Sequence, residues 1–230
     1  MSKFLMMNLF PVNCAMFNLG EESRGMNSQI LREVYELKKV LAPEKRSGRG
    51  VFQSQQDLEK DFDIFSKLRD HFTPLATSFL QESGFIGDPW EYLELGSFWF
   101  NYNSNQNAYH LPHTHGYGET MFSGVYFPTS GILNGEHESS NQNLDEDISL
   151  NFTNNPAPGD LVLLDPNHAL KRAVTVSKQT YYPYYGNSLS ITPREGLLVI
   201  FPAYLMHMVV PTEKENFERL TIVFDISKKQ

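Results

Sequence analysis

The pattern of apolar residues changes abruptly near Pro89, and this change constrains the fold more than any other feature. Before it, apolar side chains recur at helical spacing in two stretches, residues 26–41 and 57–80. After it, short apolar or alternating segments are separated by turn residues such as Pro158-Gly159-Asp160. Two helices followed by about eight short strands indicate a mainly β chain with helices, an antiparallel sandwich or jelly roll backed by the helices.

The first 90 residues supply the helical part. Helical spacing predicts a helix over residues 26–41 that is ended by Pro43. A second helix is expected over 57–80, with Pro74 as a break and helix resuming to Gly84, because proline removes a backbone donor. Residues 5–17 are expected to form an edge strand broken by Pro11, and residues 45–50 a loop.

The rest of the chain is expected to form the sheets. Alternating or short apolar runs predict strands at residues 93–103, 121–127, 148–152, 161–164, 189–192, 197–201, 207–210 and 220–226. The polar, acidic residues 133–147 are expected to form a surface loop.

Length and composition bound the remaining possibilities. A chain of 230 residues with 40% apolar and 20% charged residues fits one domain, with residues 1–90 supporting a core of residues 91–230. A net charge of −8 disfavours a nucleic-acid partner. No run reaches the roughly 18 apolar residues of a membrane span. Cys14 is the only cysteine, which is typical of a reducing compartment, so we expect a cytoplasmic protein.

Histidines carry the strongest chemical signal. His110, His113 and His115 crowd one short stretch, and residues two apart in an extended chain point to the same side, so His113 and His115 can converge on one metal ion. His110 is odd-spaced from His113 and lies before Pro112, so it need not share that face. A metal site with open positions needs a third protein ligand. His207, in an apolar segment that follows a strand and Pro202, is the candidate.

Arg219 lies in the apolar strand that follows His207. A hairpin would place it beside His207, and a guanidinium in such a strand requires an anionic partner. A dicarboxylate could supply that partner through two parallel hydrogen bonds. Thr221 lies two residues on, on the same face, and can add a hydroxyl.

The chain resembles a family of 2-oxoglutarate- and Fe(II)-dependent oxygenases related to prolyl hydroxylases. The resemblance rests on short pieces that occur in order along the chain: Phe10-Pro11, Asn101-Tyr102-Asn103, His113-Thr114-His115, Ser123-Gly124-Val125-Tyr126-Phe127, Pro158-Gly159-Asp160, residues 196–202, residues 207–211 and Arg219-Leu220-Thr221.

This resemblance implies a double-stranded β-helix, which is a jelly-roll or cupin-like barrel. It also implies that His113 and His207 are iron ligands, that Arg219 pairs with the distal carboxylate of 2-oxoglutarate, and that O₂ is the co-substrate. The wider superfamily carries His-X-Asp or His-X-Glu where this chain has His115. The third ligand is therefore either His115, which strand alternation favours, or a carboxylate such as Glu119.

The substrate and partners follow only by analogy. The resemblance implies hydroxylation of a small molecule or a peptide, with a prolyl residue as the first expectation, and a homodimer is common for such barrels. Two other readings are a cupin-like three-histidine metalloenzyme that does not use 2-oxoglutarate, and a binding module that uses the tyrosine-rich residues 181–185.

Overall fold

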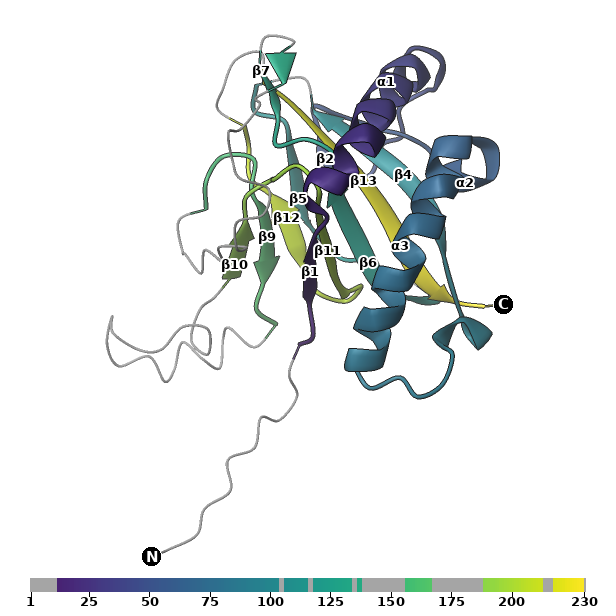
Figure 1. Cartoon of the computed structure of the whole chain (residues 1–230). Helices are drawn as coiled ribbons and strands as arrows, with labels where there is room; N and C mark the ends of the chain where they lie inside the picture. The colour runs from purple at the N-terminus through teal and green to yellow at the C-terminus, as the bar shows by residue number, and fades with distance from the viewer. Residues whose placement is uncertain are drawn as a thin grey trace, which may run out of the picture.

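The computed structural model describes residues 12–103, 106–115, 118–133, 136–137, 156–166, 188–212 and 217–229. Strands in this part of the chain form two antiparallel sheets that pack face to face, and helices cover the outer face of the larger sheet (Figure 1).

The larger sheet contains most of the long strands. Its main order is β1 (Ala15–Asn18), β11 (Leu197–Pro202), β6 (Thr120–Phe127), β13 (Phe217–Lys228), β4 (Leu93–Asn103) and β3 (Val51–Gln53). The short strands β7 (Ile132–Leu133) and β8 (Glu136–His137) extend from β13. The smaller sheet has the order β10 (Ser188–Ile191), β9 (Leu161–Leu164), β12 (His207–Val209), β5 (Tyr109–His113) and β2 (Gly48–Arg49).

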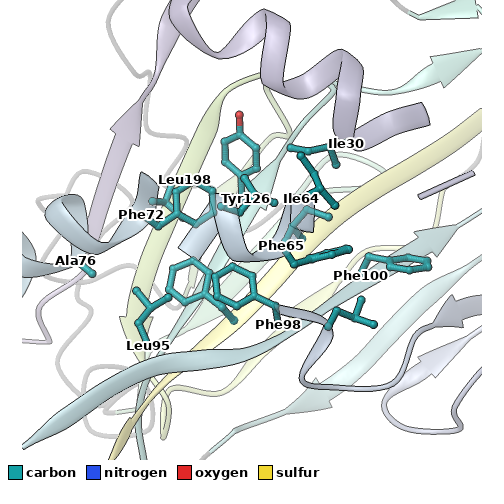
Figure 2. Close-up of a cluster of buried hydrophobic side chains, with 14 of the residues drawn as sticks. Ile30, Ile64, Phe65, Phe72, Ala76, Leu95, Phe98, Phe100, Tyr126 and Leu198 are labelled. Carbon is teal, nitrogen blue, oxygen red and sulfur yellow. The ribbon is translucent and has the colours of Figure 1, made fainter. Parts of the chain in front are cut away.

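Two long helices, α1 (Arg24–Val40) and α3 (Asp63–Glu82), lie against the larger sheet. The short helix α2 (Leu58–Asp61) precedes α3, and 3₁₀ turns lie at Gly20–Ser23 and Pro89–Glu91. The apolar stripes of both long helices pack on the outer side chains of β4, β6, β11 and β13, where aromatic rings gather around Phe72, Phe98 and Tyr126 (Figure 2).

Strand β13 shows how alternation sorts side chains between the two faces of the larger sheet. Leu220, Ile222, Phe224 and Ile226 belong to the core beneath the helices. The residues between them face the smaller sheet, where a second apolar core and a cavity lie. The same strand therefore builds the fold with one face and the candidate site with the other.

The predicted fold class is confirmed, as two facing antiparallel sheets with helices on the outer face of the larger one. The prediction for residues 93–103 matches β4, and the helix predicted over 26–41 is α1. Strand 148–152 and the tyrosine-rich residues 181–185 lie outside the described residues. None of the helices in the described ranges is long and apolar enough to cross a membrane.

Two local predictions are wrong. Pro74 does not break a helix, since α3 runs through it. Its side chain is exposed, and the buried neighbours Phe72 and Ala76 hold both halves of α3 against the sheet. The break falls instead at Phe62, whose extended backbone separates α2 from α3. Within the predicted loop 45–50, the strand β2 pairs with β5.

Candidate metal centre

Three histidines from two strands and one loop converge in the space between the sheets. His113 ends β5, His115 lies two residues beyond it, and His207 begins β12. One potential ligand atom from each of the three lies within 4.8 Å of the others. The ring centroids of His113 and His207 are 4.3 Å apart, and those of His115 and His207 are 5.0 Å apart. Donor nitrogens this close can share one metal ion.

The hydrogen bonds of His113 and His207 indicate which nitrogen is available. Nδ1 of His113 lies 2.7 Å from the carbonyl oxygen of Leu111, and Nδ1 of His207 lies 3.0 Å from that of Leu205. Because a carbonyl can only accept, each Nδ1 is assigned the proton, and each Nε2 keeps a lone pair. Both rings are thus oriented as metal-binding histidines usually are.

Burial also keeps these two rings neutral. Desolvation lowers the pKa of His113 to about 4, and it lowers the pKa of His207 well below the ordinary histidine value. The neighbouring histidines depress both pKa values further. A neutral imidazole is the form that binds a metal ion, so the site needs no proton release from these rings near pH 7.

His115 is held by a different kind of partner. Its Nδ1 lies 3.0 Å from Oδ1 of Asp225 and 2.6 Å from Oγ of Ser123. The alternative third ligand, Glu119, is exposed, whereas His115 lines the cavity. The geometry therefore brings together His113, His115 and His207 and leaves Glu119 outside.

His110 lies on the same side of its sheet as His113. The odd spacing of the two residues left this open, and both side chains line the cavity. In the pairing of β5 with β12, His113 lies opposite His207, and His110 lies opposite Val209. Three steps along β5 thus match two along β12, and this register shift accompanies the placement of both histidines on one face. Sequence spacing alone contains no signal for this shift.

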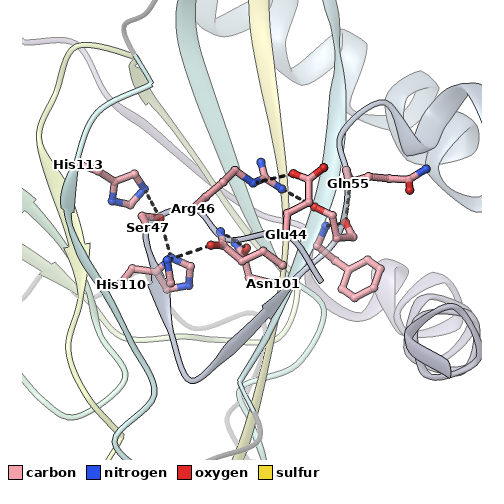
Figure 3. A network of polar contacts seen from close by, with 11 residues as sticks. Glu44, Arg46, Ser47, Gln55, Asn101, His110 and His113 are labelled. Atoms are coloured by element: carbon pink, nitrogen blue, oxygen red, sulfur yellow. Dashed lines mark hydrogen bonds and ion pairs between the residues drawn. The ribbon is translucent and has the colours of Figure 1, made fainter. Parts of the chain in front are cut away.

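His110 is buried and only partly satisfied. The hydroxyl of Ser47 lies 3.1 Å from Nδ1 of His110 and 3.2 Å from Nε2 of His113, so it links the two rings (Figure 3). Nε2 of His110 has no hydrogen-bond partner in the described part of the chain. Burial, and then the positive charge of Arg219, lowers the pKa of His110 to about 3.

Arg219 is the most unusual side chain of the cavity. It is 2% exposed, its Nε has no hydrogen-bond partner, and no carboxylate of the described residues lies within ion-pair distance. Its guanidinium carbon lies 5.3 Å from the ring centre of Phe127. Burial lowers its pKa to about 10, although the charge of Asp160 opposes this shift. A buried guanidinium that stays charged near pH 7 and has no carboxylate partner among the described residues favours an anionic ligand.

The cavity that joins these groups has a volume of about 740 Å³. Arg219, Thr221, Val223 and Asp225 supply one wall from β13, and the histidines supply the opposite one. Thr221 lies on the same face as Arg219, as alternation predicts. His168 and residues 181–185 lie outside the described residues.

The donor set fits a specific pair of ligands. Three neighbouring imidazoles suit a divalent transition metal, because a three-ligand face leaves adjacent positions open. The buried arginine suits the carboxylate of a small acid bound beside that metal.

A family model supports the same interpretation. Residues 97–225, more than half of the 230-residue chain, match the model of the 2OG-Fe(II) oxygenases. This match runs from β4 to β13 and therefore includes Arg219 and the four histidines that line the cavity, His110, His113, His115 and His207. None of the curated protein sequences matches the chain.

Solved structures share the fold. A prolyl-4-hydroxylase from Pseudomonas putida has a TM-score of 0.60 and 16% identity, and the match covers 95% of this chain and 94% of that one. A Trichoplax adhaerens prolyl hydroxylase with a hypoxia-inducible-factor peptide fragment has a TM-score of 0.56 and 13% identity, covering 94% and 83%. The α-ketoglutarate-dependent epimerase SnoN has a TM-score of 0.60 and 12% identity, covering 94% and 77%.

Proposed function

Because this chain belongs to the 2OG-Fe(II) oxygenase family, we propose that it uses Fe(II) and 2-oxoglutarate to hydroxylate a substrate with O₂. Membership of this family establishes the oxygenase class and implies the two cofactors. We assign the iron to His113, His115 and His207, and 2-oxoglutarate to Arg219 and Thr221. Turnover of 2-oxoglutarate then gives succinate and CO₂.

One observation carries the proposal. Three imidazoles and a buried arginine without a carboxylate partner among the described residues line a single cavity. A buried guanidinium is costly without an anion, so the burial of Arg219 favours an anionic ligand in this cavity. A structural metal site would have no need of Arg219. A metal that binds a dicarboxylate beside it accounts for both features.

The residues around the metal position the co-substrate and exclude water. We assign the distal carboxylate of 2-oxoglutarate to the guanidinium of Arg219 and the hydroxyl of Thr221, which lie on one face of β13. The unpaired Nε2 of His110 is a further polar contact for a ligand in this cavity. The apolar walls Val209 and Val223 keep this end of the cavity dry. Bound iron and 2-oxoglutarate supply the oxidising chemistry.

A peptidyl proline is the substrate we put first. The support is the fold shared with two prolyl hydroxylases, one of which was solved with a peptide fragment. The similar epimerase SnoN acts in nogalamycin biosynthesis, so a small molecule is the competing substrate class.

Succinate release tests the proposal. Purified protein with Fe(II), ascorbate, O₂ and 2-oxoglutarate should release succinate, and a peptide library rich in proline should raise the rate. Arg219→Met should abolish release. Glu218→Gln is the matched control on the same strand, because Glu218 accepts the hydroxyl of Tyr35 at 2.6 Å on the helix side. Oxidation of a substrate without 2-oxoglutarate, unaffected by Arg219→Met, would instead indicate the cupin-like three-histidine enzyme.

A further inference from the structure

A carboxylate lies within hydrogen-bond distance of the His115 ring. Asp225 is 7% exposed and Ser123 is fully buried. Oγ of Ser123 lies 2.6 Å from Oδ1 of Asp225, and both atoms lie within 3.0 Å of Nδ1 of His115. These three side chains form a closed hydrogen-bonded group beside the proposed iron site.

The protons of this group can be counted. Ser123 has one hydroxyl proton, and the carboxylate of Asp225 can only accept, so that proton points to Oδ1 of Asp225. Oγ of Ser123 and Oδ1 of Asp225 then both present lone pairs to Nδ1 of His115. Nδ1 therefore carries the ring proton, and the lone pair is on Nε2. This is the tautomer that the backbone carbonyls fix in His113 and His207.

The backbone holds the group in place. Asp225 of β13 and Ser123 of β6 are direct partners in the sheet register. The backbone N–H of His115 donates to the carbonyl of Ala203 at 2.8 Å, which ties the loop of His115 to the end of β11. His115 lies beyond the last residue of β5, so strand pairing alone does not orient its ring. Asp225 and Ser123 supply the missing constraint.

Charge gives Asp225 a second role. The three proposed ligands are neutral imidazoles and do not offset the two positive charges of Fe(II). Among the described residues, a carboxylate lies one hydrogen bond beyond His115, on Asp225. A carboxylate that accepts the N–H of a ligating imidazole makes that imidazole a stronger donor.

We propose that Asp225, assisted by Ser123, is a positioning residue of the iron site: it fixes the tautomer and orientation of His115 and supplies the negative charge that the three-histidine ligand set lacks. This inference rests on the proposed function, since it requires His115 to be an iron ligand. It assigns Asp225 a role through His115 and no contact with the metal.

Metal affinity measures this role without turnover. Mn(II) is titrated calorimetrically into the full-length, metal-free protein and the variants Asp225→Asn, Ser123→Ala, His115→Ala and Glu218→Gln. Asn keeps the shape of Asp225 but removes its charge. We expect Mn(II) affinity to fall by about 10- to 100-fold in Asp225→Asn, as for other partners of ligating histidines. Ser123→Ala should lose several-fold, and Glu218→Gln, on the opposite face of β13, should match the wild type.

A spectroscopic readout separates this role from a merely structural one. The visible ligand-field absorption of the Co(II)-loaded protein reports the donors around the metal. It should shift in Asp225→Asn and stay unchanged in Glu218→Gln. Far-ultraviolet circular dichroism of the metal-free variants checks folding. If Asp225→Asn does not fold, Ser123→Ala decides, since wild-type affinity and absorption in that variant would overturn the proposal.

The outcomes also separate this inference from the proposed function. Wild-type Mn(II) affinity and Co(II) absorption in Asp225→Asn, with a large loss in His115→Ala, would overturn the role of Asp225 alone. Wild-type affinity in His115→Ala would show that the proposed ligand set is wrong, and the role of Asp225 would fall with it.

Discussion

The two faces of strand β13 contrast more sharply than any other neighbouring regions of the molecule. On the helix side, Phe224 is fully buried and packs against the rings of Phe72 and Phe98, with centroid distances of 5.5 and 5.2 Å. On the cavity side, Arg219 is 2% exposed, yet its Nε has no hydrogen-bond partner among the described residues. One face is filled by apolar packing, and the other holds a buried charge next to a cavity.

The difference separates residues that determine the fold from residues that determine the chemistry. Apolar burial on the helix face contributes to stability in direct proportion to the area removed from water. The cavity face costs stability, because it holds a guanidinium and neutral histidines away from solvent. Sites of this kind commonly reduce stability in exchange for function. Substitutions on the two faces should therefore have opposite effects on stability.

The largest expected effect on stability is on the helix face. Phe224→Ala should lower the free energy of unfolding by about 3–5 kcal/mol, since the cavity left among the surrounding rings cannot collapse fully. Urea unfolding measures this loss. Mn(II) affinity of the folded protein should change little, because Phe224 points away from the site. A loss below about 1 kcal/mol would contradict a tightly packed helix face.

Arg219→Met should have the opposite effect on the stability of the protein. It removes the poorly paired guanidinium, so the ligand-free protein should keep its stability or gain about 1 kcal/mol or more. The affinity for 2-oxoglutarate should fall by roughly 100-fold or more, because a buried charge pair loses one partner. Urea unfolding measures the stability, and calorimetric titration of the same preparation measures the affinity for 2-oxoglutarate. Clear destabilisation of the ligand-free variant would show that Arg219 has a structural partner.

Acid should lower the free energy of unfolding through His110, on the cavity side of the structure. The pKa of His110 is about 3 in the folded protein, below the ordinary 6.5, so the unfolded chain takes up the proton first. The contribution of His110 to the free energy of unfolding should therefore be fully present above about pH 6.5 and be lost as the pH drops toward 3. The slope is at most about 1.4 kcal/mol per pH unit for this residue.

Unfolding of the metal-free protein between pH 7 and 4.5 measures this slope. His110→Gln should remove the contribution of His110, so the free energy of unfolding should depend less on pH. An unchanged slope in that variant would show that His110 does not contribute to the acid sensitivity.

The smallest expected effect is at Thr221. Thr221→Val keeps the shape and removes only the hydroxyl, so the affinity for 2-oxoglutarate should fall by about 0.5–1.5 kcal/mol. Calorimetry on the Mn(II)-loaded protein measures this loss. Equal affinities in the variant and the wild type would remove Thr221 from the proposed co-substrate site.

Sequence patterns predicted the regular elements well and the irregular ones poorly. Alternation predicted the bounds of β4 to the residue, because each face of that strand packs against its own apolar core. The helical break was placed wrongly at Pro74, because tertiary packing of α3 outweighs the lost hydrogen bond. Burial of neighbouring side chains is a property of the folded chain and has no signature at the proline itself.

The candidate site divides in the same way. The sequence named His113, His115 and His207, which converge, and Arg219, which lines the same cavity. It left the face of His110 open, since the register shift between β5 and β12 arises only when the strands pair. It missed Asp225, which lies 110 residues from His115, because only the fold brings a distant carboxylate to a ring nitrogen.

The most direct test of the central claim is an anaerobic calorimetric titration of 2-oxoglutarate into the Mn(II)-loaded protein. The account predicts saturable binding at one site, dependent on the metal and lost in Arg219→Met. No binding, or binding of equal strength without the metal and in Arg219→Met, would contradict the claim that the three histidines and Arg219 form one cofactor site.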